Sequence, residues 1–143
     1  MPFTSFFDHA AIMANLFSAS VYSVPSNWYI ALSTTTPTQA QGTSPPWNFT
    51  EPSGNGYARV TVANNSTNWV SAAAPATGWT MENGTAITFP VATGSWGTVT
   101  YVGIFDASSS GNCVAYGALT SSQAITTNDI GSFAINALTI TNN

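Results

Sequence analysis

From residue 57 onward, the chain alternates short apolar runs with separators rich in Gly, Ser, Thr and Asn. Runs that are enriched in β-branched and aromatic residues and bounded by turn formers predict β-strands. The strongest predicted strands cover residues 98–105, 113–119 and 133–140. Further strands are predicted at 57–63 and 85–89, and weaker ones at 69–74 and 79–81. Turns are predicted at 64–68, 106–112 and 120–129. Strands at this spacing predict a mostly-β fold, an antiparallel β-sandwich of about seven strands or a partly closed barrel.

An earlier strand is predicted at residues 28–32, where large apolar side chains alternate along the chain. The whole chain has 143 residues, a length that suits one domain with a core of its own. The sequence has no internal repeat, coiled-coil heptad or collagen-like glycine period. We therefore expect residues 1–143 to form a single β-sandwich domain that is not a fibre shaft.

One α-helix is predicted near the N-terminus, over residues 5–20. Ser5 followed by Asp8 resembles a capping box. The residues that follow at helical spacing form a wide apolar stripe, and its members are Phe6, Ala10, Met13 and Phe17. The stripe either packs on the sheet of the same chain or docks against another subunit. In the second case Phe6, Met13 and Phe17 are candidate partner contacts.

A long loop is predicted at residues 34–56, which are rich in Thr, Pro, Gly and Ser. Long loops in compact domains are often functional or flexible. Trp47 and Phe49 lie in the middle of this loop. They either form a contact surface for a partner or fold over the core as a lid.

Arg59 is the only permanent cation of the chain. A buried guanidinium without a partner is costly, so we expect it to pair with Glu51, Asp106 or Asp129. Arginine is also enriched at protein interfaces, which makes Arg59 a further candidate partner contact.

Charge is scarce throughout, at 4% of residues with a formal net charge of −4. Soluble domains typically carry about 25% charged residues. A neutral polar surface repels itself weakly, which favours assembly with neighbouring subunits over a free monomer. One basic residue is too few for nucleic acid or for a polybasic membrane contact. The apolar runs are also shorter than the roughly 20 residues that span a bilayer.

The residues that usually carry catalysis or metal binding are sparse. His9 is the only histidine and Cys113 is the only cysteine. We expect Cys113 to be a buried, inert thiol. The carboxylates show no spacing typical of a metal site or of a catalytic pair, and Asp106 is expected to organise its own turn. We therefore predict that the protein is not an enzyme and uses no cofactor and no metal.

Two phrases, EPSGNGYARV at residues 51–60 and WGTVTYVGIFDA at 96–107, occur in this order. They resemble a family of small structural proteins of tailed bacteriophages, many of them known as tail-fibre proteins. The resemblance extends over about residues 28–140. It implies a non-enzymatic virion protein, made in the host cytoplasm and carried on the particle exterior. It also implies that Arg59, in the phrase GYAR, has a structural role.

Two locations on the particle fit this resemblance. As a capsid cement or decoration protein, the chain would clamp the major capsid protein. As a tail-fibre or baseplate component, it would attach to other tail proteins. A small homo-oligomer is expected in both cases.

Two other classes remain open. One is a carbohydrate-binding β-sandwich module for attachment to the host surface, in which indole rings stack on sugars. Its candidate platforms are Trp28, Trp47, Trp69, Trp79 and Trp96. The other is a cellular β-sandwich adhesin, which the lack of an evident secretory signal disfavours.

Overall fold

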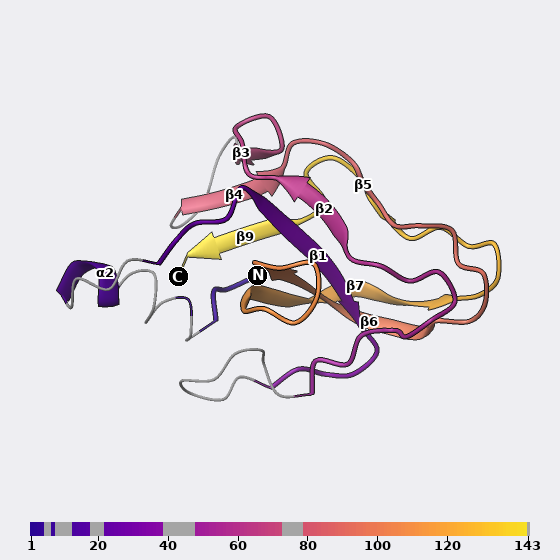
Figure 1. The fold of residues 1–143 in the computed structure, drawn as a ribbon. Coiled ribbons are helices and arrows are strands. Elements are labelled where there is room, and N and C mark those ends of the chain that lie inside the picture. The colour runs from indigo at the N-terminus through magenta and orange to yellow at the C-terminus, as the bar shows by residue number, and fades with distance from the viewer. Residues whose placement is uncertain (5–6, 8–12, 18–21, 39–47, 73–78, 143) are drawn as a thin grey trace.

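The computed structural model describes residues 1–4, 7, 13–17, 22–38, 48–72 and 79–142. This part of the chain is mostly β, with nine strands and one short helix, α2 (Ala14–Phe17) (Figure 1). Every strand pair within it is antiparallel. The predicted fold class is therefore confirmed, although the described strands number nine and not seven.

The larger sheet has the strand order β2-β1-β6-β7. Its strands are β1 (Asn27–Ser33), β2 (Val60–Ala63), β6 (Gly97–Phe105) and β7 (Cys113–Ile125). The two central strands, β1 and β6, become fully buried toward their C-terminal ends, as the apolar runs in their sequences predict. The edge strand β7 is buried only where it begins and at its last residue.

A second layer faces this sheet and consists of two short sheets. One has the order β3-β4-β9, with β3 (Trp69–Ser71), β4 (Trp79–Asn83) and β9 (Thr139–Asn142), and the other pairs β5 (Ile87–Thr88) with β8 (Ser132–Phe133). Figure 1 shows β4 and β9 lying across the larger sheet. Apolar side chains of the two layers form one cluster of buried residues, which includes Ile30, Leu32, Trp69, Ile87, Phe89, Ile104 and Leu138. Each such side chain contributes about 1.5–3 kcal/mol by leaving water.

Several predicted boundaries shift by a few residues: the strand predicted at 57–63 begins at Val60, and the one predicted at 79–81 extends to Asn83. Two further segments differ more. The turn predicted at 120–129 is wrong at its start, because β7 continues through Ile125 and pairs with the beginning of β6. The strand predicted at 133–140 is wrong as one element, because it is divided into β8 and β9. The interruption surrounds the fully buried Asn83, whose Nδ2 donates to the Ala134 carbonyl at 2.8 Å and whose Oδ1 accepts from the Leu138 N–H at 2.7 Å. These bonds require a turn in place of a straight strand.

The first residues of the chain connect the edges of both layers. The Phe3 backbone forms an antiparallel bridge with Ala115 of β7, and the Thr4 N–H donates to the Val114 carbonyl at 2.8 Å. On the other layer, the Met1 amino group donates to the Thr139 carbonyl of β9 at 2.7 Å. Residues 1–4 therefore close one side of the sandwich. Of the predicted helix at 5–20, α2 lies in the described part, whereas 5–6, 8–12 and 18–20 lie outside it.

Candidate functional site

Arg59, which follows the long loop, is the centre of a compact group of contacts that we call the Arg59 node. Its side chain is 6% exposed and pairs with Glu51, with Nη2 and Oε1 2.5 Å apart and Nε 3.1 Å from both carboxylate oxygens. Nη1 donates to the carbonyls of Ala107 at 2.7 Å and Ser110 at 2.9 Å. The guanidinium carbon lies 3.8 Å from the centroid of the Phe105 ring. The predicted pairing of Arg59 with a carboxylate is confirmed, and Glu51 is the partner.

Tyr57 extends the node into the larger sheet. Its hydroxyl donates to Glu51 Oε2 at 2.9 Å and accepts from the Leu32 N–H of β1 at 2.9 Å. Burial, reinforced by the Glu51 carboxylate, raises the pKa of Tyr57, so the phenol remains protonated. The phrase GYAR thus joins the end of the long loop, strand β1 and the turn after β6.

Asp106, another predicted partner of Arg59, instead holds its own turn. Its Oδ1 accepts from the Asn112 N–H at 2.6 Å and its Oδ2 from the Asn112 side chain at 2.8 Å. The prediction that Asp106 organises this turn is confirmed. Asp129, the third carboxylate considered, accepts from Thr126 in a separate turn.

Phe49, one of the two aromatic residues predicted at the middle of the loop, is half-buried on the larger sheet. Its ring meets the Phe105 ring edge-on, with centroids 5.1 Å apart, and it covers Gly103 of β6. A Cβ on Gly103 would lie 2.7 Å from Phe49 Cε2, so only glycine leaves room for this ring. Phe49 therefore folds over the sheet, as the lid alternative predicts. Trp47 lies outside the described residues.

The N-terminal end of the molecule displays three large apolar side chains, which we call the apolar tip. Met13, Leu16 and Phe17 are 53%, 70% and 78% exposed. Figure 1 shows α2 at the outer end of the fold, beyond the strands. The Tyr22 N–H donates to Asn15 Oδ1 of α2 at 2.8 Å, and the Tyr22 ring packs edge-on against Phe7. Two of the predicted contact residues, Met13 and Phe17, thus lie together, whereas Phe6 is outside the described residues.

An apolar pocket opens between the layers at the end where the N-terminal residues cross, and we call it the tryptophan pocket. Its volume is about 210 Å³. Its described lining residues are Phe3, Phe7, Trp28, Asn64, Trp69, Met81, Ile104, Val114, Ala115 and Ile140. Trp69 is 7% exposed, and its Nε1–H has no hydrogen-bond acceptor among the described residues. A buried donor without a partner usually costs about 1–3 kcal/mol.

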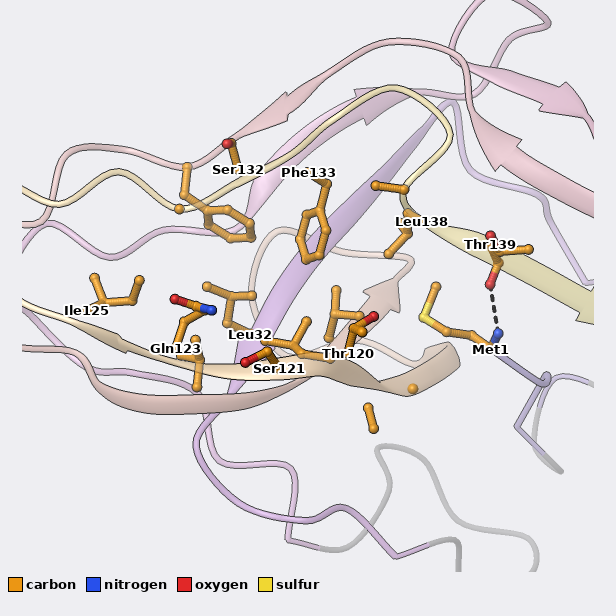
Figure 2. A pocket seen from close by; sticks show the side chains of 18 of the residues that line it. Met1, Leu32, Thr120, Ser121, Gln123, Ile125, Ser132, Phe133, Leu138 and Thr139 are labelled. Atoms are coloured by element: carbon orange, nitrogen blue, oxygen red, sulfur yellow. Dashed lines mark hydrogen bonds between the residues drawn. The ribbon is translucent and has the colours of Figure 1, made fainter.

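A larger cleft of about 650 Å³, the edge cleft, lies between β7 and the strands β8 and β9 (Figure 2). Along one wall of the cleft the β6–β7 register shifts: Val99 pairs with Gln123 and Tyr101 with Ala118, so residues 119–122 form a bulge in β7. Figure 2 shows Thr120, Ser121 and Gln123 on one side and Phe133 and Leu138 on the other. The described lining carries no charged side chain.

Reactive groups are few in the described part of the chain. No three His, Cys, Asp or Glu side chains gather there in a way that would hold a metal ion. Cys113 is fully buried, as predicted, and burial raises the pKa of its thiol to about 12, which keeps it protonated and unreactive. No helix in this part is both long and apolar enough to cross a membrane.

Comparison with known proteins places the chain. The family model described as "Podophage GP4 fiber I protein gp80" matches residues 4–141. The chain belongs to this family. The fiber I family confirms the predicted resemblance to phage structural proteins, and the protein is a structural component of a phage virion. No curated protein matches the chain.

The region matched by the fiber I model contains the Arg59 node and the apolar tip. It also contains most of the lining of both cavities; Met1, Pro2 and Phe3 lie just outside it. The sequence indicated the node and the tip through single residues. It gave no signal for either cavity, because each is formed by side chains that are distant in the chain.

Proposed function

We propose that the protein is a non-enzymatic tail-fibre component on the exterior of a tailed-phage particle, where it binds other virion proteins. The observation that carries this proposal is the match of residues 4–141 to the podophage fiber I family. The described structure supports it, because its exposed and unsatisfied groups suit contacts between proteins and offer no arrangement typical of catalysis.

The apolar tip supports a role in assembly. Large side chains exposed together are costly in water and mark interaction sites when they cluster. Contacts between neutral surfaces avoid the desolvation cost of buried charge and depend weakly on salt. Many weak contacts of this kind add together when a particle carries several copies. Adhesion within the virion would therefore persist over a wide range of ionic strength.

The long loop supplies a second candidate contact, in which Trp47 remains a proposed partner residue. The structure fixes the C-terminal end of this loop beside β1: the Thr34 N–H donates to the Thr50 carbonyl at 3.0 Å, and the Thr50 N–H to Ser33 Oγ at 3.1 Å. The Arg59 node holds Glu51 next to it. Such anchoring would give the loop a defined position from which to reach a partner. Arg59 would then contribute indirectly, by holding the loop in position, without contacting the partner itself.

The test is quantitative mass spectrometry of density-purified particles, which gives the number of copies relative to the major capsid protein. A ratio far below one, together with immunogold labelling at the tail, is expected for a fibre component. A ratio near one or a simple fraction of it, with label over the head, would instead indicate a capsid decoration protein. Absence from the particles would refute both virion locations.

The edge cleft favours a second candidate function, the binding of a neutral carbohydrate. Hydroxyl and amide side chains stand on one wall and the half-buried Phe133 ring on the other, above an apolar floor (Figure 2). Binding clefts of about 300–1,000 Å³ commonly have this composition. The indole platforms considered from the sequence fit less well, because Trp69 and Trp96 are buried. Side chains of Trp47 and Trp79 are outside the described part.

Carbohydrate binding would be tested with polysaccharide extracted from the host envelope, by saturation-transfer NMR. Gln123→Ala should weaken the transfer signal, and Thr98→Ala, an exposed change outside the cleft, should leave it unchanged. Equal transfer in the wild type and in Gln123→Ala would exclude the edge cleft as the site.

A further inference from the structure

The apolar tip and the tryptophan pocket are complementary features of one chain. The tip consists of Met13, Leu16 and Phe17, which are 53–78% exposed. The pocket is a cavity of about 210 Å³ between the two layers. Both lie at the end of the fold where the N-terminal residues cross between layers, as Phe3 and Phe7 line the pocket and Tyr22 links Phe7 to α2.

The lining of the pocket defines the chemistry of its occupant. The walls are indole, phenyl and aliphatic groups, and Asn64, the one polar side chain among the described lining residues apart from the indoles, already donates to the Pro25 carbonyl at 3.1 Å. A buried water molecule needs roughly two to four polar partners, which this lining does not offer. An apolar side chain of a partner fits the walls and the volume.

Trp69 adds no polar requirement. Its indole lines the pocket, and its Nε1–H is buried without an acceptor among the described residues. Because this nitrogen is itself sealed from solvent, it sets no requirement on an occupant, which needs only to be apolar.

The tip meets these requirements, but not within its own molecule. In a single copy its side chains are largely exposed, so the pocket of that copy does not cover them. Neither feature carries a charged side chain in the described residues, so two copies approach without like-charge repulsion. We propose that Phe17, with Leu16 beside it, inserts into the tryptophan pocket of a second copy of the chain.

This contact joins two different surfaces, so it is heterologous. Repeated around an axis, such contacts close into a ring when the rotation permits, and every tip and every pocket is then occupied. The inference rests on the proposed assembly role and deepens it, because it names the partner at the tip. It assigns the tip to contacts between copies of the chain. The long loop is then the candidate contact for other virion proteins.

The first experiment is disulfide trapping between two single variants of the whole chain. Leu16→Cys and Met81→Cys are purified separately, mixed and oxidised; Leu16→Cys keeps Phe17 available for insertion, and Met81 is 37% exposed and lines the pocket. The native Cys113 is fully buried and does not interfere. A cross-linked dimer is expected in this mixture, because the two Cα atoms must approach within about 7 Å. The matched control replaces Met81→Cys by Val91→Cys, which is 48% exposed and lies outside the pocket, and should give little dimer.

The second measurement is the mass of the wild type and of charge variants by analytical ultracentrifugation. Phe17→Asp and Met81→Glu should each weaken self-association about tenfold or more, since a charge must then enter an apolar pocket. Val91→Glu adds the same charge elsewhere and should leave association unchanged. Thermal unfolding checks that all three variants fold.

The inference is overturned if the Leu16→Cys and Met81→Cys variants cross-link no more than the control pair, or if the wild type is monomeric at every concentration tested. Neither result would affect the fibre role, which particle composition tests independently. Conversely, specific trapping with no protein on the particles would leave this contact standing and refute the proposed function.

Discussion

The Arg59 node and the N-terminal end differ in how completely their groups are satisfied. In the node, the Arg59 guanidinium pairs with a carboxylate, two carbonyls and a ring, all from its own chain. At the N-terminal end, the apolar tip is exposed and Trp69 Nε1 has no acceptor in the described part of the chain. A region whose groups are paired internally supports the fold. The exposed apolar region is the one that we propose for assembly, and mutations should separate these two roles.

The largest effect is expected from Arg59→Ala. It leaves the partly buried Glu51 carboxylate without its cation and frees the Ala107 and Ser110 carbonyls. Breaking a buried pair by removing one partner typically costs about 3–5 kcal/mol. Urea unfolding should show a loss of this size. A loss below about 1 kcal/mol would mean that the node is not what stabilises the loop, and the contrast with the N-terminal end would fail.

A smaller effect on the same side of the comparison is expected from Gly103→Ala. The new Cβ would meet the Phe49 ring at 2.7 Å and force it off the sheet. Overpacking of this kind costs about 1–3 kcal/mol. Adding Phe49→Ala should recover part of the loss, which a double-mutant cycle measures. Additive losses would show that Phe49 does not rest on Gly103 in solution.

The node could be anticipated from the sequence largely by elimination. With one permanent cation and five acidic residues in the chain, Arg59 had few partners available. The turn at Asp106 was also predictable, since Asp before Ser and Gly accepts backbone bonds locally. The choice of Glu51 over Asp106 was not, because it depends on how the loop returns to the sheet.

The errors in strand boundaries arose where tertiary contacts override local pattern. Residues 120–125 read as a turn by composition, yet β7 continues because the first residues of β6 pair with Gln123, Ala124 and Ile125. The apolar run at 133–140 read as one strand, yet the buried Asn83 binds its middle and bends it. Asn136 marks the point where the predicted strand is interrupted, since its φ of 62° is typical of a turn.

Alkaline pH should distinguish the two regions through their tyrosines. Burial is the main cause that raises the pKa of Tyr57 in the node and that of Tyr22 at the N-terminal end, the latter to about 12. Both pKa values are raised above that of the unfolded chain, about 10. Their contribution to stability is therefore complete below pH 10 and is lost as pH rises toward the folded-state values.

The measurement is the melting temperature between pH 8 and 11. The melting temperature should fall less steeply with rising pH in Tyr57→Phe than in Tyr22→Phe, because the Tyr57 phenol is the more deeply buried of the two. The slopes of melting temperature against pH are compared, and not the melting temperatures themselves, because Tyr57→Phe also loses hydrogen bonds to Glu51 and Leu32. Cys113 titrates earlier in the unfolded state and contributes equally to both variants. Equal slopes would show that the two tyrosines are equally shielded.

The smallest effect on stability is expected from Phe17→Asp. Its side chain is 78% exposed, and substitutions at such surface positions usually change stability by less than about 0.5 kcal/mol. Self-association should nevertheless weaken. A change at Phe17 thus mainly affects assembly, whereas a change at Arg59 mainly affects folding. Urea unfolding at a protein concentration low enough to keep the chain monomeric measures the stability of the fold without a contribution from self-association. A marked loss of monomer stability would mean that α2 packs on its own sheet, the alternative that the apolar stripe left open.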